Sequence, residues 1–72
     1  MSWNQFPSFT SSNLASARYE ETQAILEVTF HNGGTYQYFD VPSHIAEAMK
    51  NADSKGAFLA ANIKGHYRYS KA

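Results

Sequence analysis

Residues 24–41 read AILEVTFHNGGTYQYFDV, and this stretch holds the strongest strand pattern of the chain. Leu26, Val28 and Phe30 alternate with polar residues at the period-2 spacing of a strand that has one solvated face. The Asn-Gly-Gly that follows is a hairpin signal. We therefore predict two antiparallel strands, over residues 24–31 and 35–41, joined by a tight loop.

The length of that loop determines where the tyrosines of the second strand lie. A two-residue loop would place Tyr36 and Tyr38 on the face opposite Leu26, as an exposed aromatic platform. A three-residue loop, closed by Gly33 in the left-handed region, turns both rings toward the core instead. Tyr36 then pairs with Val28, and the following tyrosine pairs with Leu26. We favour this register because it gathers the large side chains on one face.

The flanking segments complete an α+β fold. Residues 14–20 predict an earlier strand, which ends at a polar turn over residues 20–23. A first helix is predicted over residues 42–52, because Pro42 suits its first position and the apolar residues recur at helical spacing. Ser54 is a favourable N-cap for a second helix over residues 55–64.

A tail over residues 66–71 follows the second predicted helix. Gly65 is placed for a left-handed C-cap, and residues 66–71 predict either a short strand or an extended strap. The predicted fold class is α+β: a three-stranded antiparallel β-meander followed by two short helices packed on one face, with a short C-terminal strand as an option.

Residues 1–10 predict an extended N-terminal arm ahead of a single domain over residues 11–72. Trp3, Phe6 and Phe9 are many aromatic residues for a free tail, and Pro7 interrupts any central strand. The arm either docks on the core or binds a partner. Docking is favoured, because exposed large apolar side chains reduce solubility.

Composition limits the class of protein. The 72 residues are 43% hydrophobic and 15% aromatic, and they include no cysteine, which indicates one globular core without disulfides. No apolar run is long enough for a membrane span, and the N-terminus does not resemble a signal peptide. We therefore expect a cytoplasmic protein without a membrane partner.

The charges are divided between the two halves of the chain. Residues 1–42 carry one arginine against four acids, whereas residues 43–72 carry five lysines and arginines against two acids, and no acid follows Asp53. Such an asymmetry either marks an anion-binding face or balances the surface of a small domain.

Two basic motifs in the second half are candidate binding sites. Ser54-Lys55-Gly56 could hold a phosphate at the start of a helix, or it could be an ordinary helix cap in which the glycine allows close packing. The tail interleaves stackable rings with basic side chains, as single-stranded nucleic acid requires, or its tyrosines cover the edge of the core. The candidate nucleic-acid-binding residues are Ser54, Lys55, Gly56, Lys64, His66, Tyr67, Arg68, Tyr69 and Lys71.

An ordered set of motifs resembles the KTSC domain, a family named for its occurrence at the C-terminus of some lysyl-tRNA synthetases. The resemblance covers residues 11–71, with Ala17 in place of a larger aliphatic residue and Arg68 in place of a frequent proline. The family also occurs as small stand-alone bacterial and phage proteins. The matching motifs are Ser11-Ser12-Asn13-Leu14, Tyr19, Leu26-x-Val28-x-Phe30, Asn32-Gly33, Tyr36-x-Tyr38-x-x-Val41-Pro42, Ser54-Lys55-Gly56 and Ile63-Lys64-Gly65-x-Tyr67-x-Tyr69.

The resemblance implies no established activity, and only the synthetase context suggests RNA binding. His31, His44 and His66 lack metal-ligand spacing, and Asp40 and Glu47 form no recognisable acid/base pair. We therefore expect a non-enzymatic binding module without cofactor or metal, whose partner is RNA or another polyanion. The alternative is a protein-interaction or stabilising module that uses the aromatic arm and a sheet edge.

Overall fold

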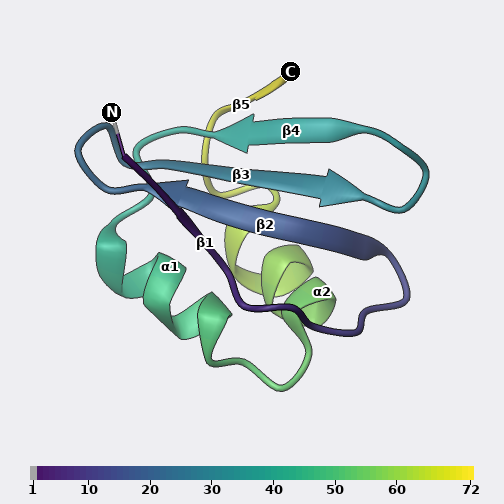
Figure 1. The fold of residues 1–72 in the computed structure, drawn as a ribbon. Helices are drawn as coiled ribbons and strands as arrows, with labels where there is room; N and C mark the ends of the chain where they lie inside the picture. Colours follow the sequence, from purple (N-terminus) through teal and green to yellow (C-terminus); the bar gives the residue numbers. More distant parts are fainter. Residues whose placement is uncertain (1) are drawn as a thin grey trace.

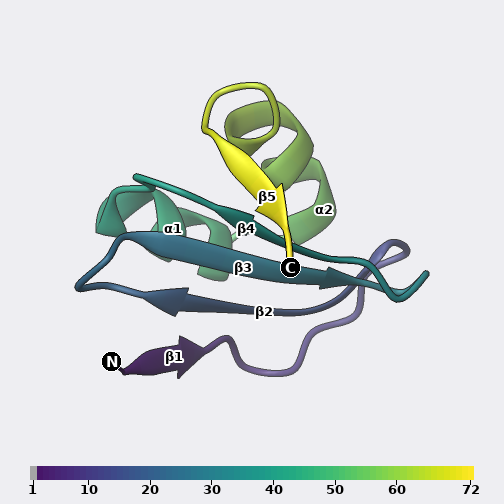
Figure 2. The same cartoon turned by 90° about the horizontal axis from the view of Figure 1, so that it is seen from above.

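A computed structural model describes residues 2–72 and shows an antiparallel sheet with helices on one side of it (Figures 1 and 2). The strands follow one another across the sheet in chain order. They are β1 (Trp3–Gln5), β2 (Leu14–Glu20), β3 (Ile25–Phe30), β4 (Thr35–Tyr38) and β5 (Tyr69–Lys71). The helical segments are α1 (Ser43–Lys50), α2 (Lys55–Phe58) and the π-helical η1 (Leu59–Ile63).

The sheet has five strands, so the predicted meander of three was too small. β5 confirms that the tail forms a strand, in which Tyr69 pairs with Tyr38 of β4. β1 lies within the predicted arm and pairs with β2, with Trp3 opposite Glu20. β1 was not predicted, because three residues are too few to show an alternation of polar and apolar side chains. Its place at the sheet edge also agrees with a proline shortly after it.

The hairpin register is the predicted one. Val28 pairs with Tyr36, and Leu26 pairs with Tyr38. Gly33 has a φ of 97°, and its N–H donates to the carbonyl of Phe30 at 2.9 Å, which closes the three-residue loop. The Tyr38 side chain is therefore buried, whereas that of Tyr36 is half-buried.

β4 ends at Tyr38, earlier than predicted, because the chain turns sharply at Asp40. This residue has a φ of 61°, in the left-handed region that strand residues do not adopt. The turn returns Val41 to the core, where its N–H donates to the carbonyl of Ala24 at 2.9 Å. The Tyr19 hydroxyl donates to the carbonyl of Val41 at 2.6 Å, so the turn is held from two sides.

Both predicted helices are present. α1 is shorter than the predicted helix over residues 42–52, because Pro42 has an extended ψ of 151° and is the N-cap residue, not the first helical residue, and the helix ends at Lys50. α2 begins after Ser54, whose Oγ accepts a hydrogen bond from the N–H of Ala57 at 3.2 Å. η1 continues α2 with a wider last turn, in which the N–H of Lys64 donates to the carbonyl of Leu59 at 2.8 Å. Gly65 follows with a φ of 82°, as expected of a left-handed C-cap.

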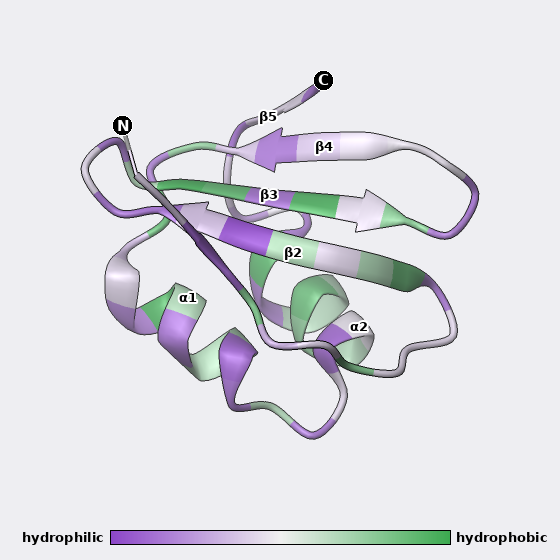
Figure 3. Ribbon diagram, viewed as in Figure 1, coloured by the Kyte–Doolittle hydropathy of each residue, from purple (hydrophilic) through white to green (hydrophobic). Residues whose placement is uncertain are grey.

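The hydrophobic core lies between the sheet and the helices. Figure 3 shows hydrophobic and hydrophilic bands alternating along α1, so that one side of the helix is available for packing. None of the helices formed by residues 2–72 is long and apolar enough to cross a membrane. The buried hydrophobic residues are Phe6, Leu14, Ala17, Tyr19, Leu26, Val28, Tyr38, Val41, Ala46, Met49, Leu59 and Ile63.

The N-terminal arm is docked, as predicted. Phe6 is buried, and Phe9 packs against the core cluster. Trp3 lies under the guanidinium of Arg18, which is 4.1 Å from the ring centroid. The arm therefore contributes its aromatic residues to the fold.

Glu20 is a fully buried carboxylate that fixes the arm and the turn after β2. One carboxylate oxygen accepts the N–H of Ser2 at 2.8 Å, and the other accepts the N–H of Gln23 at 2.8 Å. These backbone donors, that of Ser2 first, lower the pKa of Glu20 below its ordinary value. The sequence analysis placed Glu20 at the start of a polar turn. In the structure its carboxylate joins the N-terminal arm to the turn after β2.

The sheet face away from the helices carries a polar ladder across β2, β3 and β4. Arg18 Nε donates to Glu27 Oε2 at 2.6 Å, and Gln37 Nε2 donates to Glu27 Oε1 at 2.9 Å. The hydrogen bond from Arg18 is the largest influence and lowers the pKa of Glu27, while partial burial opposes it. The ionised Glu27 therefore stabilises the folded state fully above its ordinary pKa of 4.5. This stabilisation is lost as the pH falls from 4.5 through the lower pKa of the folded state.

We expect Glu27→Gln to reduce the acid sensitivity of the fold. Urea unfolding at a series of pH values from neutral to acidic should show a smaller fall in stability for the variant than for the wild type. Glu21→Gln, which changes an exposed glutamate of the β2–β3 turn, is the matched control and should keep the wild-type dependence. An identical pH dependence in Glu27→Gln and the wild type would contradict the assigned role of the ladder.

Candidate functional site

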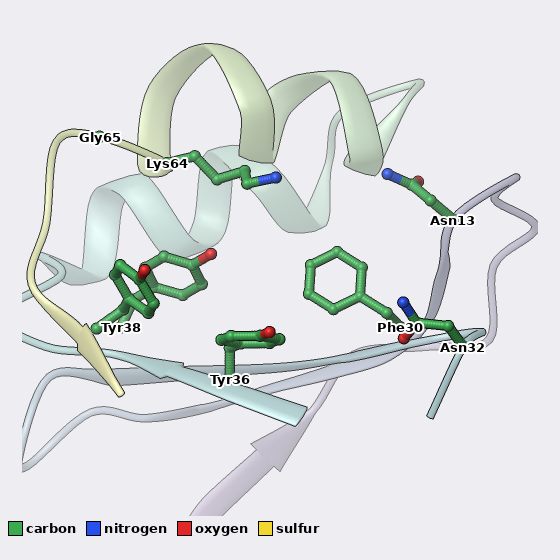
Figure 4. Close-up of a pocket in the computed structure, with 8 residues that line it drawn as sticks. Asn13, Phe30, Asn32, Tyr36, Tyr38, Lys64 and Gly65 are labelled. Atoms are coloured by element: carbon green, nitrogen blue, oxygen red, sulfur yellow. The ribbon is translucent and has the colours of Figure 1, made fainter. Parts of the chain in front are cut away.

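An open groove of about 570 Å³ lies between the sheet and the end of η1 (Figure 4). We call it the aromatic groove. Figure 4 shows the ring of Tyr36 on the sheet side, with Lys64 reaching over it from the helical side. The residues that line the groove are Asn13, Phe30, Asn32, Tyr36, Tyr38, Lys64, Gly65 and Tyr69.

Four aromatic rings form a continuous cluster along the groove. The Phe30 and Tyr36 rings meet edge to face, with centroids 5.6 Å apart. Tyr69 is tilted against Tyr36 and Tyr38, with centroid distances of 5.9 and 5.8 Å. Strand pairing produces this cluster, because side chains of directly paired residues lie on the same face. Tyr69 is 63% exposed, so its ring is open to a ligand.

Two carboxamides stand at one end of the groove, beside Phe30 (Figure 4). The Asn32 Oδ1 accepts the N–H of Gly34 at 3.0 Å, and the Asn13 Oδ1 accepts the Ser11 hydroxyl at 3.0 Å. Their oxygens are thus engaged, and among residues 2–72 neither Nδ2 group donates a hydrogen bond. Both amide groups therefore offer donors to a ligand.

The groove presents positive charge and hydroxyl groups, and among the described residues 2–72 no acid lines it. Lys64 is exposed, and its Nζ lies 6.0 Å from the Phe30 ring centroid. Lys71 pairs with Tyr36, which places it on the same face of the sheet. Burial, followed by the neighbouring Tyr69, raises the pKa of Tyr38, so this phenol keeps its proton at neutral pH.

The structure separates the predicted tail residues into different surroundings. Lys64 and Tyr69 line the groove, and Lys71 lies on its face of the sheet. His66 is exposed outside the groove lining, and Tyr67 packs against the core cluster. The remaining tail cation, Arg68, pairs with an acid: its Nη2 lies 2.8 Å from Asp40 Oδ2.

The Ser54-Lys55-Gly56 motif has the geometry of a packed helix cap. Lys55 Nζ donates to the carbonyl of Ala52 at 3.0 Å and lies 5.3 Å from the Phe9 ring centroid. A Cβ on Gly56 would lie 2.4 Å from Asn13 Oδ1, so the glycine allows Asn13 its position. Since Asn13 also lines the aromatic groove, this motif shapes one end of the groove.

Six of the residues that line the groove were absent from the predicted site. They are Asn13, Phe30, Asn32, Tyr36, Tyr38 and Gly65. The register analysis had treated the two tyrosines as either a core surface or an exposed platform. In the structure both tyrosines line the groove, but Tyr38 is buried, as a core residue is, whereas Tyr36 is half-buried. The aromatic alternation in the hairpin was the available signal.

Groups suited to metal binding do not converge in the structure. Within the described part of the chain, residues 2–72, no cluster of three or more His, Cys, Asp or Glu side chains could hold a metal ion. His31 Nε2 lies 2.9 Å from the carbonyl oxygen of Ser11, and Asp40 is engaged by Arg68. The groove itself offers aromatic rings, carboxamide donors and a lysine ammonium group to a ligand.

The comparisons agree with the fold and the motifs. The KTSC domain family matches residues 10–67, and the chain therefore belongs to this family. A crystal structure of a KTSC domain protein from Yersinia pestis is 32% identical, has a TM-score of 0.90 and covers 99% of each chain.

Relatives include both small proteins and parts of large ones. An uncharacterized protein of Stutzerimonas stutzeri is 43% identical over 82% of this chain and 84% of its own length. A lysine–tRNA ligase of Trichormus variabilis is 41% identical over 75% of this chain. The match spans 10% of that ligase, so the similarity concerns one small part of it.

Proposed function

We propose that this KTSC domain protein is a small binding module for single-stranded RNA or another polyanion, with Lys64 and Lys71 as phosphate contacts. The observation that carries the proposal is the placement of two exposed lysines on the face of an aromatic groove that no acid lines. Lys55 and Arg68 contribute less, because the first donates a hydrogen bond to the loop carbonyl of Ala52 and the second is paired with Asp40.

The relatives are consistent with this partner. A related segment occurs in proteins named lysine–tRNA ligase, whose name states that they act on a tRNA. A fused domain can also serve its host in other ways, so the groove carries the proposal and the relatives only support it.

Salt dependence provides the direct test. Each phosphate contact to a single strand contributes about −0.7 to the slope of log K against log salt concentration. Two lysine contacts therefore predict a slope of about −1.4 and a Kd of roughly 10⁻⁴ to 10⁻⁶ M at physiological salt. Fluorescence anisotropy of a labelled single-stranded oligouridylate, titrated at several salt concentrations, measures both quantities.

Lys64→Gln should weaken binding and make the slope less steep by about 0.7, because it removes one phosphate contact. Lys50→Gln is the matched control, since Lys50 is an exposed lysine on α1 that does not line the groove. Equal effects of the two variants, or no binding at low salt, would overturn the proposal.

A second candidate function is strand addition at a sheet edge. β1 and β5 are the outermost strands, and each pairs with one neighbouring strand. A partner strand held there by backbone hydrogen bonds would bind with little dependence on salt. The salt titration therefore separates the two functions.

A further inference from the structure

We infer that the aromatic groove takes one unpaired nucleobase of a single-stranded nucleic acid. The base stacks against the exposed ring of Tyr69, its edge faces the carboxamides of Asn13 and Asn32, and its phosphate lies at Lys64. The inference rests on the proposed function and adds the ligand group that the groove recognises. A volume of about 570 Å³ is within the usual range of small-ligand sites, roughly 300–1,000 Å³.

The ring cluster fits the flat face of a base. Tyr36 and Tyr38 fix Tyr69 from the sheet side, with centroids 5.9 and 5.8 Å away, while most of its surface stays accessible. A ring that is held in place by its neighbours loses little conformational freedom on binding. Stacking on such a ring strengthens binding by about 5- to 150-fold per base.

The polar groups fit the edge of a base and its phosphate. The Nδ2 groups of Asn13 and Asn32 are donors, and carbonyl oxygens and ring nitrogens of an unpaired base are acceptors. Figure 4 shows the two carboxamides near Phe30, with Lys64 above the rings. One bound nucleotide could therefore meet a stacking ring, amide donors and a cation at once.

The charge distinguishes this ligand from a proline-rich peptide. Aromatic grooves also bind such peptides, whose uncharged backbone needs no lysine. The aromatic groove is lined by Lys64, is approached by Lys71 on the same sheet face, and has no acid in its lining. A polyphosphate backbone complements this arrangement, so a nucleic acid is favoured.

The test compares two oligonucleotides of equal length, an oligouridylate and its abasic counterpart, which carry the same number of phosphates. We expect the base-containing strand to bind the full chain about 5- to 150-fold more tightly. Tyr69→Leu should remove most of this difference, whereas Tyr69→Phe, which keeps the ring, should preserve it. Lys64→Gln should weaken both strands to the same degree.

A second measurement needs no variant. In NMR titrations of the wild-type protein, the ring protons of Tyr36 and Tyr69 should shift with the oligouridylate and stay in place with the abasic strand. Equal affinity for both strands would overturn the base pocket and leave the polyanion module intact. Binding of neither strand would overturn both proposals, and capture of a polyproline peptide by the groove would then assign it to peptide recognition.

Discussion

Tyr38→Ala is expected to lower the free energy of unfolding by about 3–5 kcal/mol, the usual result of removing a large aromatic ring from a core. The Tyr38 side chain is 3% exposed and pairs directly with Leu26 of the neighbouring strand. It also supports Tyr69, whose ring centroid lies 5.8 Å away. A domain of this size is stable by only a few kcal/mol to about 10 kcal/mol, so the loss is a large fraction of the total.

Urea unfolding followed by circular dichroism measures this loss. Tyr69→Ala is the matched control, because it removes the same side chain from an exposed position on the paired strand. The control should change stability by less than about 1 kcal/mol. A loss below about 1 kcal/mol in Tyr38→Ala, no larger than in the control, would show that Tyr38 is not a core residue and would favour the alternative register.

Leu26→Ala is expected to cost about 2–5 kcal/mol, the range for a fully buried leucine. Leu26 is 0% exposed and lies on the central strand of the sheet, between its partners Tyr19 and Tyr38. Truncation of the Leu26 side chain leaves a cavity, because the neighbouring side chains are closely packed and cannot all move in to fill it.

The adjacent residue provides a matched control for this second prediction. Ile25 is half-buried and points to the opposite face of β3, because side chains alternate along a strand. Ile25→Ala should cost about 1 kcal/mol, mainly through the lower strand propensity of alanine. If Ile25→Ala destabilised the protein as much as Leu26→Ala in urea unfolding, the alternation would not define the core face.

The two core positions also explain why the groove can exist without a ligand. Tyr38 belongs to both the buried core and the groove lining, so the packing that stabilises the fold also holds the ring cluster in place. The groove is therefore preformed, which reduces the cost of ordering it on binding. Variants for binding studies should accordingly change Tyr69 or Lys64, and Tyr38 should be kept.

Local pattern was sufficient for most elements of the fold. The alternation around Leu26, the Asn-Gly-Gly loop and the caps at Pro42 and Ser54 each act within a few residues, so they could be recognised without the tertiary structure. The hairpin register followed as well, because only one of the two loops brings the large side chains to one face. β1 could not be found in this way, since its three residues form a strand only because β2 offers its edge.

The environment of each charge was decided by tertiary contacts. Glu20 stands in a polar stretch of sequence, yet the return of the arm buries it against backbone donors of Ser2 and Gln23. The sequence suggested that Lys55 and Arg68 are free cations, but Lys55 donates a hydrogen bond to the loop carbonyl of Ala52, and Arg68 pairs with Asp40. These hydrogen-bond and ion-pair partners are brought together by turns or by contacts between distant segments, so composition and spacing do not reveal them.

The sequence by itself determined the α+β class and the hairpin, and it favoured the observed register over one alternative. Only the tertiary structure decided that Asn13, Phe30, Tyr36 and Lys64 meet in one groove. These residues come from separate segments, and their approach depends on how the helices pack against the sheet. Packing of this kind is set by side-chain shape over the whole core, which no local pattern contains.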